Sequence, residues 1–383
     1  MEINLVSFDL PYPPNYGGVI DVFYKIQALV KQGINIHLHC FQYGRPKQQK
    51  LSELCASVTY YQRAPIWKSL PLRIPHIISS RKNNRLLKAL TTTNRPIIFE
   101  GLHCSAFLSH PALTHHIKCV RMHNVEWEYY HLLSQRESNL FRRIYLKQEA
   151  KLLKAYESQL QYANLIFSIS PRDHQYLKHK FQQTHYIPAF HPNKNVQTKV
   201  GKGKYCLYHG NLSVPENHEA AQFLITKVFS QTNIPLIIAG ANPKPELLNA
   251  IKPYPHISIQ SNLPENQMNR LIQDAHIHTL PTFQPTGIKL KLLNALFQGR
   301  FCIVNPQMVQ MTQLEPACII AQNAKDFRQH INRLFQRPFD DNQIKKRNKI
   351  LANHYSNQTN AKKVIDLIQS YSQNYQPNLA YHN

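Results

Sequence analysis

The sequence predicts an α/β protein with two domains, each built around a parallel sheet. The chain has 383 residues, which exceeds the roughly 250 to 300 residues at which single cores stop growing. Apolar, strand-like runs alternate with segments of helical periodicity, and this alternation stops in a stretch rich in Pro, Lys, Asn and Gly before it restarts. We therefore expect a first domain over 1–185, a linker over 186–204, a second domain over 205–354 and a helical tail over 355–383.

The first half begins with a strand, a loop, a helix and a second strand. Residues 3–8 have the pattern of a buried strand, the Pro-rich loop PYPPNYGG follows, and apolar residues then recur at helical spacing from Val22 to Val30. Gly33 stands where a helix C-cap is expected, before a strand at 34–41. This order is the unit of a parallel doubly wound sheet. Further strands are expected at 96–100, 118–122 and 164–170, and a long charged helix at 140–162.

The second half repeats the alternation. Strands are expected at 205–210, 235–240, 256–260, 277–281 and 301–304. Helices are expected after Pro215 and up to Gly299, and the tail is predicted to be helical from about 356 to 371 with an apolar stripe. Two Rossmann-like domains therefore account for most of the chain.

Cysteine usage and hydropathy narrow the class of protein. The seven cysteines are widely spaced, odd in number and without a CxxC pair, so we expect buried thiols in a reducing compartment and no disulfide framework or zinc knuckle. The N-terminal run lacks the features of a secretory signal. No segment approaches the roughly 18 to 20 consecutive apolar residues that span a bilayer. These features predict a cytoplasmic protein that does not span the membrane.

The formal net charge is +24 and is concentrated toward the front of the chain. Residues 1–200 hold 26 Lys and Arg against 11 Asp and Glu, and residues 201–383 hold 19 against 10. Such an excess attracts nucleic acid, anionic lipid head groups or phosphorylated substrates. Composition alone does not distinguish among these three kinds of partner.

The segment PTFQPTGIKLKLLNALFQGRFCIV at 281–304 predicts an anion site. A strand ends at Leu280, a loop with Gly287 and Ile288 follows, and a helix begins beside Lys289 and Lys291. Unpaired backbone amides and the helix dipole attract an anion there, and two lysines add full charges, so a diphosphate fits. The alternative is that both lysines are solvated on a surface helix.

Two more segments place polar or small residues where ligands bind in α/β folds. Gly17 and Gly18, in the loop PPNYGG, allow backbone to come close to a ligand, although a Gly pair in a turn is common. In VRMHNVEWEYY a strand end delivers His123, Asn124 and Glu126 to the carboxyl edge of the sheet. We predict His123 as a catalytic residue that contacts a sugar hydroxyl or phosphate and Glu126 as the group that orients it. The alternative is a structural histidine.

A basic stretch without acidic residues lies between Glu53 and Glu100. Aromatic and aliphatic residues interleave with the positive charges, which is typical of a surface that docks on anionic head groups. The alternative is a solvated face of helices and loops. The residues predicted for this membrane or acceptor patch are Arg63, Trp67, Lys68, Arg73, Arg81, Lys82 and Arg85.

Taken together, these segments resemble glycosyltransferase family four, the retaining GT-B enzymes that use nucleotide-sugar donors. The resemblance runs through PPNYGG, MHNVEWEYY, YESQLQYA with SPRD, YHGNLSVPEN, LIIAG and TGIKLKLLNALFQGRFCIV, and so covers nearly the whole chain. It implies two Rossmann-like domains that face each other across a cleft and a C-terminal helix that crosses back to the first domain.

The resemblance also assigns roles to residues. It implies that Gly17 and Gly18 face the donor diphosphate and His123 the transferred sugar. Lys289 and Lys291 would bind the phosphates, and Asn211 and Pro215 would lie on the nucleotide side. The family often has two glutamates around this phosphate loop, and here those positions are Thr286 and Asn294. Asn294 can still hydrogen-bond a ribose, but without the stronger charge-assisted bond.

The leading interpretation is therefore retaining transfer of a sugar, expected to be a hexose, from a UDP- or GDP-linked donor to a glycan or lipid-linked acceptor in surface polysaccharide synthesis. No Asp-x-Asp pair is present, so we expect no metal and no cofactor besides the donor. We expect a peripheral location on the inner face of the cell membrane. Two alternatives stay open: a catalytically degenerate GT-B protein that only binds nucleotide sugar, and a basic nucleic-acid-binding protein, for which no recognition motif is found.

Overall fold

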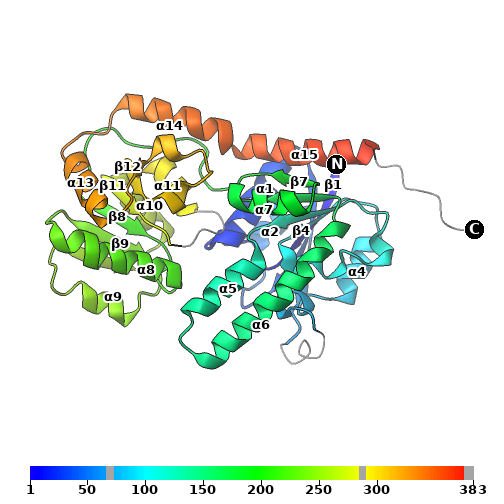
Figure 1. Cartoon of the computed structure of the whole chain (residues 1–383). Helices are drawn as coiled ribbons and strands as arrows, with labels where there is room; N and C mark the ends of the chain where they lie inside the picture. The colour runs from blue at the N-terminus through cyan, green and yellow to red at the C-terminus, as the bar shows by residue number, and fades with distance from the viewer. Residues whose placement is uncertain (66–72, 284–289, 375–383) are drawn as a thin grey trace, which may run out of the picture. The chain divides into compact units, whose positions relative to one another are not determined.

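The computed structural model describes residues 1–65, 73–283 and 290–374. These residues form two compact units. Among the described residues, unit 1 contains 1–192 and 355–374, and unit 2 contains 193–283 and 290–354. Figure 1 labels many of their helices and strands.

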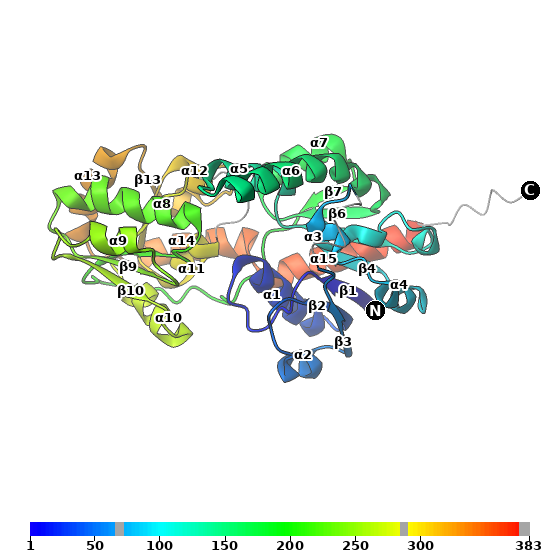
Figure 2. The same ribbon diagram turned by 90° about the horizontal axis from the view of Figure 1, so that it is seen from below.

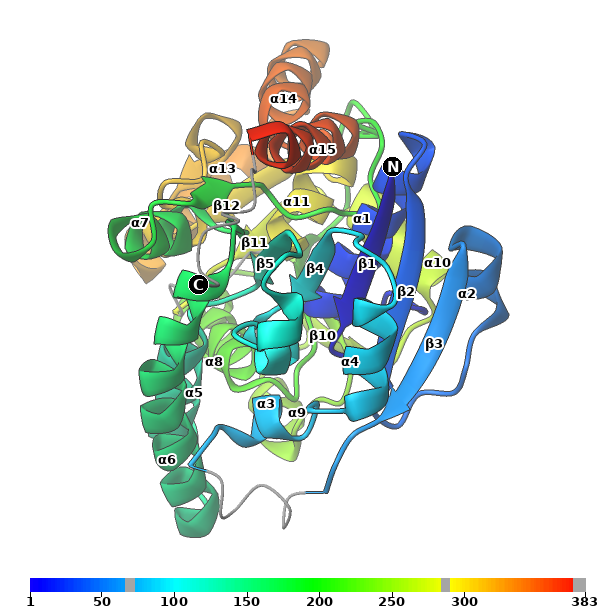
Figure 3. The same ribbon diagram turned by 90° about the vertical axis from the view of Figure 1, so that its right-hand side faces the viewer.

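Unit 1 is built on a sheet of seven parallel strands in the order β3-β2-β1-β4-β5-β6-β7. Figure 3 shows part of this row of strands. Because all strands are parallel, the loops that follow them lie along one carboxyl edge. The strands are β1 (Glu2–Ser7), β2 (Asn35–Gln42), β3 (Ser57–Gln62), β4 (Ile97–Glu100), β5 (Lys118–Met122), β6 (Leu165–Ser168) and β7 (Thr184–Tyr186).

The helices of unit 1 follow the predicted periodicity and local capping signals. In α1, Val22, Ile26 and Leu29 form a fully buried apolar stripe. The Asn139 side chain caps α6 by accepting from the backbone N–H of Arg142. The segment predicted as one helix over 140–162 ends as an α-helix at Tyr156 and continues as a 3₁₀-helix. The helices are α1 (Gly17–Lys31), α2 (Gln49–Leu54), α3 (His76–Ser79), α4 (Asn84–Thr91), η3 (Leu102–Phe107), η4 (Pro111–Leu113), α5 (Glu126–Arg136), α6 (Leu140–Tyr156), η5 (Glu157–Tyr162) and α7 (Pro171–Lys180).

The segment predicted as a linker starts inside unit 1. Tyr186 ends strand β7, which pairs with β6, and Ile187 and Phe190 are fully buried in the core of unit 1. The composition of the segment indicated irregular chain, but its few apolar residues pack against the sheet because burying them stabilises the fold. The two units divide after Pro192.

Unit 2 is built on a parallel sheet of six strands in the order β10-β9-β8-β11-β12-β13. Its strands are β8 (Cys206–His209), β9 (Leu236–Gly240), β10 (Ile257–Ser261), β11 (Ile277–Leu280), β12 (Phe301–Val304) and β13 (Ile319–Ile320). A Cβ on Gly240 would lie 1.7 Å from the carbonyl oxygen of Gly210, so only glycine fits where β8 and β9 end. Its helical segments are α8 (Pro215–Phe223), η6 (Leu224–Val228), η7 (Phe229–Gln231), α9 (Pro245–Ala250), α10 (Glu265–Asp274), α11 (Leu290–Gln298), α12 (Pro306–Val309), η8 (Glu315–Ala317), α13 (Ala324–Phe335) and α14 (Asp341–His354).

The C-terminal helix α15 (Asn357–Asn374) packs on unit 1, beside α1 (Figures 1 and 2). Val364 and Ile368 lie in the core of unit 1, and the Asn164 side chain donates to the Tyr371 hydroxyl at 2.8 Å. The tail helix therefore completes the core of the first unit, as the predicted fold class implied.

Two sequence expectations concern the state of the cysteines and the hydropathy of the helices. All seven cysteines are free thiols, and six of them are buried. In the described part of the chain, no helix combines the length and the hydropathy needed to cross a bilayer.

Candidate active site

The carboxyl edge of the unit 1 sheet holds a buried chain of charged groups. Glu100 is the last residue of β4 and His123 directly follows β5. Nε2 of His123 lies 3.0 Å from Oε2 of Glu100, and Nζ of Lys25 lies 2.6 Å from Oε1 of the same carboxylate. An ionised carboxylate only accepts, so Nε2 carries the proton of this hydrogen bond. Glu100 is fully buried and His123 is 8% exposed, which fixes the ring orientation.

Asp21 extends this chain of charges toward the centre of unit 1. Its Oδ1 lies 2.8 Å from Nη2 of Arg121, its Oδ2 lies 3.1 Å from Nε, and Nζ of Lys25 approaches Oδ2 at 3.3 Å. Although burial acts to raise it, the Arg121 guanidinium and the Lys25 ammonium hold the pKa of Asp21 below its usual value. The negative charges of Asp21 and Glu100 equal in number the positive charges of Lys25 and Arg121. His123 therefore lies beside a network with no net charge.

One group of side chains in the described residues has the spacing of a metal site. It consists of Asp21, Glu100 and His123, with potential ligand atoms within 4.8 Å of one another. The Lys25 ammonium lies between the two carboxylates, at 3.3 and 2.6 Å. The donor set therefore fits the protein's own cations rather than a divalent metal.

Glu126 begins α5 near His123 but does not orient it. We predicted that role for Glu126, and the structure gives it to Glu100, because β4 and β5 are neighbours and their ends meet. Glu126 is buried, and burial raises the pKa of its carboxyl to about 8 despite a hydrogen bond with Asn124. Its Oε1 lies 3.8 Å from Nδ1 of His103, and neither buried atom makes a hydrogen bond. Burial and the Arg81 charge hold the pKa of His103 well below its usual value.

A ring cluster lies between these histidines and the first helix. The Phe8 ring is 5.3 Å from the His103 ring and 5.4 Å from the His123 ring, centre to centre. A Cβ on Gly18 would lie 2.6 Å from Cζ of Phe8, whereas a Cβ on Gly17 would have no neighbour within 4 Å. Gly18 is thus needed for packing beside the site, and Gly17 leaves open space. Their contact with a diphosphate stays a prediction.

Arg81 does not lie on the predicted basic surface, because it is buried with 5% exposure. Its Nε and Nη2 donate to the Phe8 carbonyl at 3.1 and 3.0 Å, and its Nη1 donates to the Ile77 carbonyl at 2.5 Å. These carbonyls need donors once they are inside the protein. The guanidinium therefore supports the loop after β1 and faces no membrane.

The two ends of the basic stretch lie at opposite edges of the sheet. Arg63 follows β3 at the carboxyl edge, where it stacks on Tyr43 at 4.4 Å, while Arg95 precedes β4 at the opposite edge and pairs with Glu2 at 2.5 Å. The other predicted members in the described residues, all exposed, are Arg73, Lys82 and Arg85. Trp67 and Lys68 lie outside the described residues.

In unit 2, Lys291 lies in the first turn of α11, as predicted. Its Nζ donates to the Tyr208 hydroxyl at 3.2 Å and to Oδ1 of Asn217, and it lies 5.1 Å from the centre of the Tyr208 ring. The preceding residues of the predicted phosphate loop, Thr286, Gly287, Ile288 and Lys289, lie outside the described residues.

Two predicted residues on the nucleotide side are held by short-range contacts. The Asn211 side chain accepts from the backbone N–H and the hydroxyl of Ser213 at 3.1 and 2.8 Å, which fixes the loop before Pro215 starts α8. Asn294, expected at the ribose, accepts a hydrogen bond from Asn193 at 2.8 Å. Contact of either residue with a nucleotide stays a prediction.

The sequence analysis missed several residues near the carboxyl edges of the two sheets. In unit 1 these are Lys25, Glu100 and His103; the signal available was a charged residue at the end of the strand PIIFE and a Lys within an apolar helix. In unit 2 His209 ends β8, and burial and the Lys291 charge lower its pKa to about 3. Thr282, after β11, donates to Glu216 at 2.7 Å.

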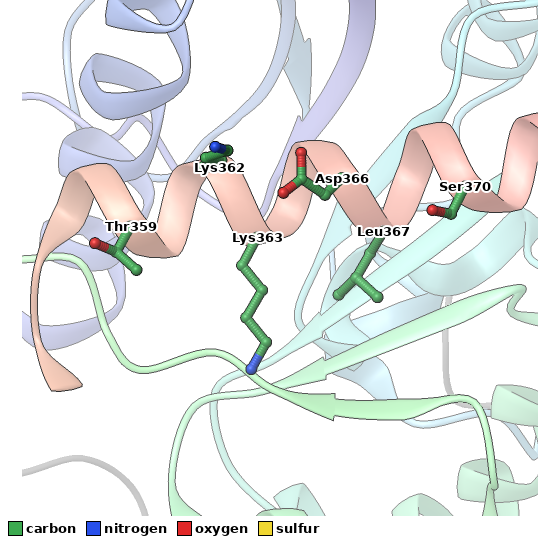
Figure 4. Close-up of a pocket in the computed structure, with 6 residues that line it drawn as sticks. All are labelled: Thr359, Lys362, Lys363, Asp366, Leu367 and Ser370. Carbon is green, nitrogen blue, oxygen red and sulfur yellow. The ribbon is translucent and has the colours of Figure 1, made fainter. Parts of the chain in front are cut away.

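A groove runs along α15 (Figure 4). Figure 4 shows Lys363 reaching away from the helix, and its Nζ donates to the carbonyl of Tyr186, the last residue of β7, at 2.9 Å. This lysine thus serves to hold the tail helix on unit 1. The residues that line the groove are Thr359, Lys362, Lys363, Asp366, Leu367 and Ser370.

Comparisons with known proteins agree with the fold. Residues 203–337 match the family model for Glycosyl transferases group 1. An uncharacterized 44.6 kDa protein in the cps region of Klebsiella pneumoniae is 27% identical over 326 residues, covering 79% of this chain and 82% of the relative.

Solved glycosyltransferase structures share the fold across nearly the whole chain. Sucrose-phosphate synthase from Thermosynechococcus elongatus superposes with a TM-score of 0.72 at 14% identity, covering 98% of this chain and 100% of that one. Anabaena HepE in complex with UDP superposes with a TM-score of 0.65 at 10% identity, covering 97% and 100%. The chain therefore has the GT-B fold, carries a group 1 glycosyltransferase domain over residues 203–337, and is a glycosyltransferase.

Proposed function

We propose that this enzyme transfers a sugar, with retention of configuration, from a nucleoside-diphosphate sugar to a glycan or lipid-linked acceptor in surface polysaccharide synthesis. The observation that carries the proposal is that each unit has a candidate site at the carboxyl edge of its own sheet. Unit 1 has an oriented imidazole, and unit 2 has a lysine at the start of a helix. The HepE structure is a complex with UDP, and the Klebsiella relative comes from a cps region. Both support the donor class and the pathway.

In this proposal unit 2 binds the donor. The Lys291 ammonium and the backbone amides at the start of α11 stabilise the negative charge that develops on the leaving nucleoside diphosphate. The bond from the anomeric carbon to the phosphate oxygen breaks, and the acceptor hydroxyl oxygen bonds to that carbon from the same face. The hydroxyl proton passes to the departing phosphate oxygen, so atoms and charge balance.

Unit 1 positions the sugar and the acceptor. Because Nε2 of His123 donates to Glu100, the other ring nitrogen is left as an acceptor in the neutral imidazole. A sugar hydroxyl that donates to this nitrogen is held in one orientation. Such orientation raises the rate of transfer. The Lys25 ammonium lies 2.6 Å from Oε1 of the same carboxylate and so helps to hold Glu100 in place beside the ring. His123 is thus a positioning group for the transferred sugar.

The test compares binding with turnover. Thermal shift identifies the donor among nucleotide sugars, since a ligand that binds only the folded state raises the melting temperature. His123→Ala is then expected to lower transfer by about a hundredfold, the order of loss from a misplaced reacting group, with nucleoside diphosphate affinity nearly unchanged. An active His123→Ala enzyme would remove the histidine from the mechanism. Donor binding without transfer to any acceptor would favour the degenerate, non-catalytic alternative.

A further inference from the structure

The α5–α6 hairpin of unit 1 carries a concentrated exposed apolar surface at its tip. Four of the eleven large hydrophobic side chains that are exposed in the described residues lie within six consecutive residues at the start of α6. Phe141 is 83% exposed, Leu140 61%, Ile144 57% and Tyr145 36%. The turn before α6 projects from the rest of unit 1 (Figures 1 and 3). Isolated exposed hydrophobics are ordinary, but such a cluster marks a contact surface.

The same helix presents only positive charge to solvent. Lys147 and Lys151 are exposed and continue the line of Ile144 along the helix at spacings of three and seven residues. The one acidic residue from 138 to 156 is Glu149, which is buried and accepts with both oxygens from the backbone N–H of His76. The carboxylate anchors α6 to α3 and takes no part in the exposed surface.

The far half of α6 is packed, so the exposed tip is a local feature of a well-anchored helix. Ala150 and Leu153 are buried against the rest of unit 1, and the Lys154 ammonium lies 4.7 Å from the centre of the Trp127 ring on α5. Arg63 and Tyr43 at the carboxyl edge lie close enough to Tyr145 to interact with it electrostatically. The tip therefore continues into a basic and aromatic region of the same edge.

We propose that the surface formed by Leu140, Phe141, Ile144, Tyr145, Lys147 and Lys151, the α6 surface, docks the enzyme on an anionic lipid bilayer. Phe141 and Ile144 enter the interface, the Tyr145 hydroxyl stays at head-group level, and the lysines contact lipid phosphates. The inference deepens the proposed function and rests on it, because it supplies the partner that would carry a lipid-linked acceptor. A second copy fits less well, because a two-fold contact through this surface would bring two sets of exposed lysines into one interface.

The test measures co-sedimentation of the full chain with phosphatidylglycerol–phosphatidylcholine vesicles and with pure phosphatidylcholine. Phe141→Ser with Ile144→Ser is expected to weaken binding to the anionic vesicles at least about tenfold, from lost apolar burial. Lys147→Glu with Lys151→Glu is expected to weaken it on the order of a hundredfold, and added salt should lower wild-type binding. Thermal melting should be unchanged, since these side chains are exposed.

Matched controls separate this surface from general properties of the chain. Tyr162→Ser removes another exposed aromatic residue of unit 1, and Lys345→Glu with Lys346→Glu makes the same charge change on α14. We expect both controls to bind vesicles within about twofold of wild type, the size expected of residues away from the docking surface. Equal losses in the controls, or wild-type binding by the α6 variants, would overturn the proposal.

The remaining outcomes distinguish the docking proposal from the proposed function. A wild-type dimer in solution that Phe141→Ser with Ile144→Ser converts to monomers would assign the surface to a second copy and overturn lipid docking. Nucleotide-sugar affinity is measured on the same variants and should be unchanged. If the protein binds vesicles but neither wild type nor any variant binds a nucleotide sugar, the proposed function is wrong and the docking surface is still supported.

Discussion

The two candidate sites hold their positive charges in different ways. In unit 1 Arg121 and Lys25 are buried against the carboxylates of Asp21 and Glu100. In unit 2 the Lys291 ammonium donates to a phenol and to an amide oxygen, both of which are neutral acceptors. The charges of unit 1 are balanced by buried carboxylates, whereas the first turn of α11 places Lys291 where the positive end of the helix dipole adds to its charge. The first arrangement stabilises a fold around an imidazole, and the second suits an anionic ligand.

Removing a buried cation from unit 1 should have the largest effect. Arg121→Met leaves two buried carboxylates, Asp21 and Glu100, with Lys25 as their shared cation, so we expect a loss of about 3–5 kcal/mol in the free energy of unfolding, measured by urea denaturation. The matched control is Arg172→Met, whose bidentate pair with Glu128 is partly exposed and should cost below about 1 kcal/mol. Similar losses in both variants would mean that burial does not distinguish these ion pairs.

The buried acid of unit 1 should make stability depend on pH. The pKa of Glu126 is about 8 in the folded protein against an ordinary 4.5, so between these values the folded state keeps a proton that the unfolded chain has released. Its stabilising contribution is therefore complete below about pH 4.5 and is lost as the pH rises toward 8. Urea denaturation at about pH 5 and about pH 8 should show a drop of a few kcal/mol in wild type relative to Glu126→Gln, which has no proton to lose. Parallel pH profiles of the two proteins would contradict this.

Removing the charge from unit 2 should weaken anion binding and leave the fold intact. Lys291→Ala is expected to reduce nucleoside diphosphate affinity by about 10- to 100-fold, the range of a hydrogen bond to a charged group. Isothermal titration measures this against Lys202→Ala, an exposed lysine near the start of unit 2. Equal affinities in the two variants would argue against a phosphate site at α11.

The smallest effects are expected at the two glycines that start α1. Gly18→Ala forces the Phe8 ring aside, so we expect a loss of about 1 kcal/mol in stability. Gly17→Ala meets no neighbour and should be neutral or more stable by up to about 1 kcal/mol. If Gly17 faces the donor diphosphate, the same variant binds the donor less tightly. Unchanged donor affinity would limit the role of Gly17 to the turn.

Much of the fold could be predicted because it depends on local patterns. Alternating strand and helix periodicities predicted two parallel sheets, and the position of His123 directly after a strand predicted its place at the carboxyl edge. The apolar stripe of the tail predicted a buried helix face, and Val364 and Ile368 are in the core of unit 1. These features need only the period of the side chains along one element.

The partners of the site residues depend on contacts between elements that are distant in the sequence. Lys25 and Glu100 are 75 residues apart, and Arg121 and Asp21 are 100 residues apart. Neither pair could therefore be predicted from spacing along the chain. Strand order brings β4 beside β5 and thereby gives His123 to Glu100 instead of Glu126. The same packing places Arg81 inside, where two carbonyls need its donors. The elements, and the sheet edge on which their polar residues lie, could be predicted from the sequence because the strand and helix periods are local. Which charges pair and which face solvent depends on three-dimensional packing, so these features were known only once the folded structure was available.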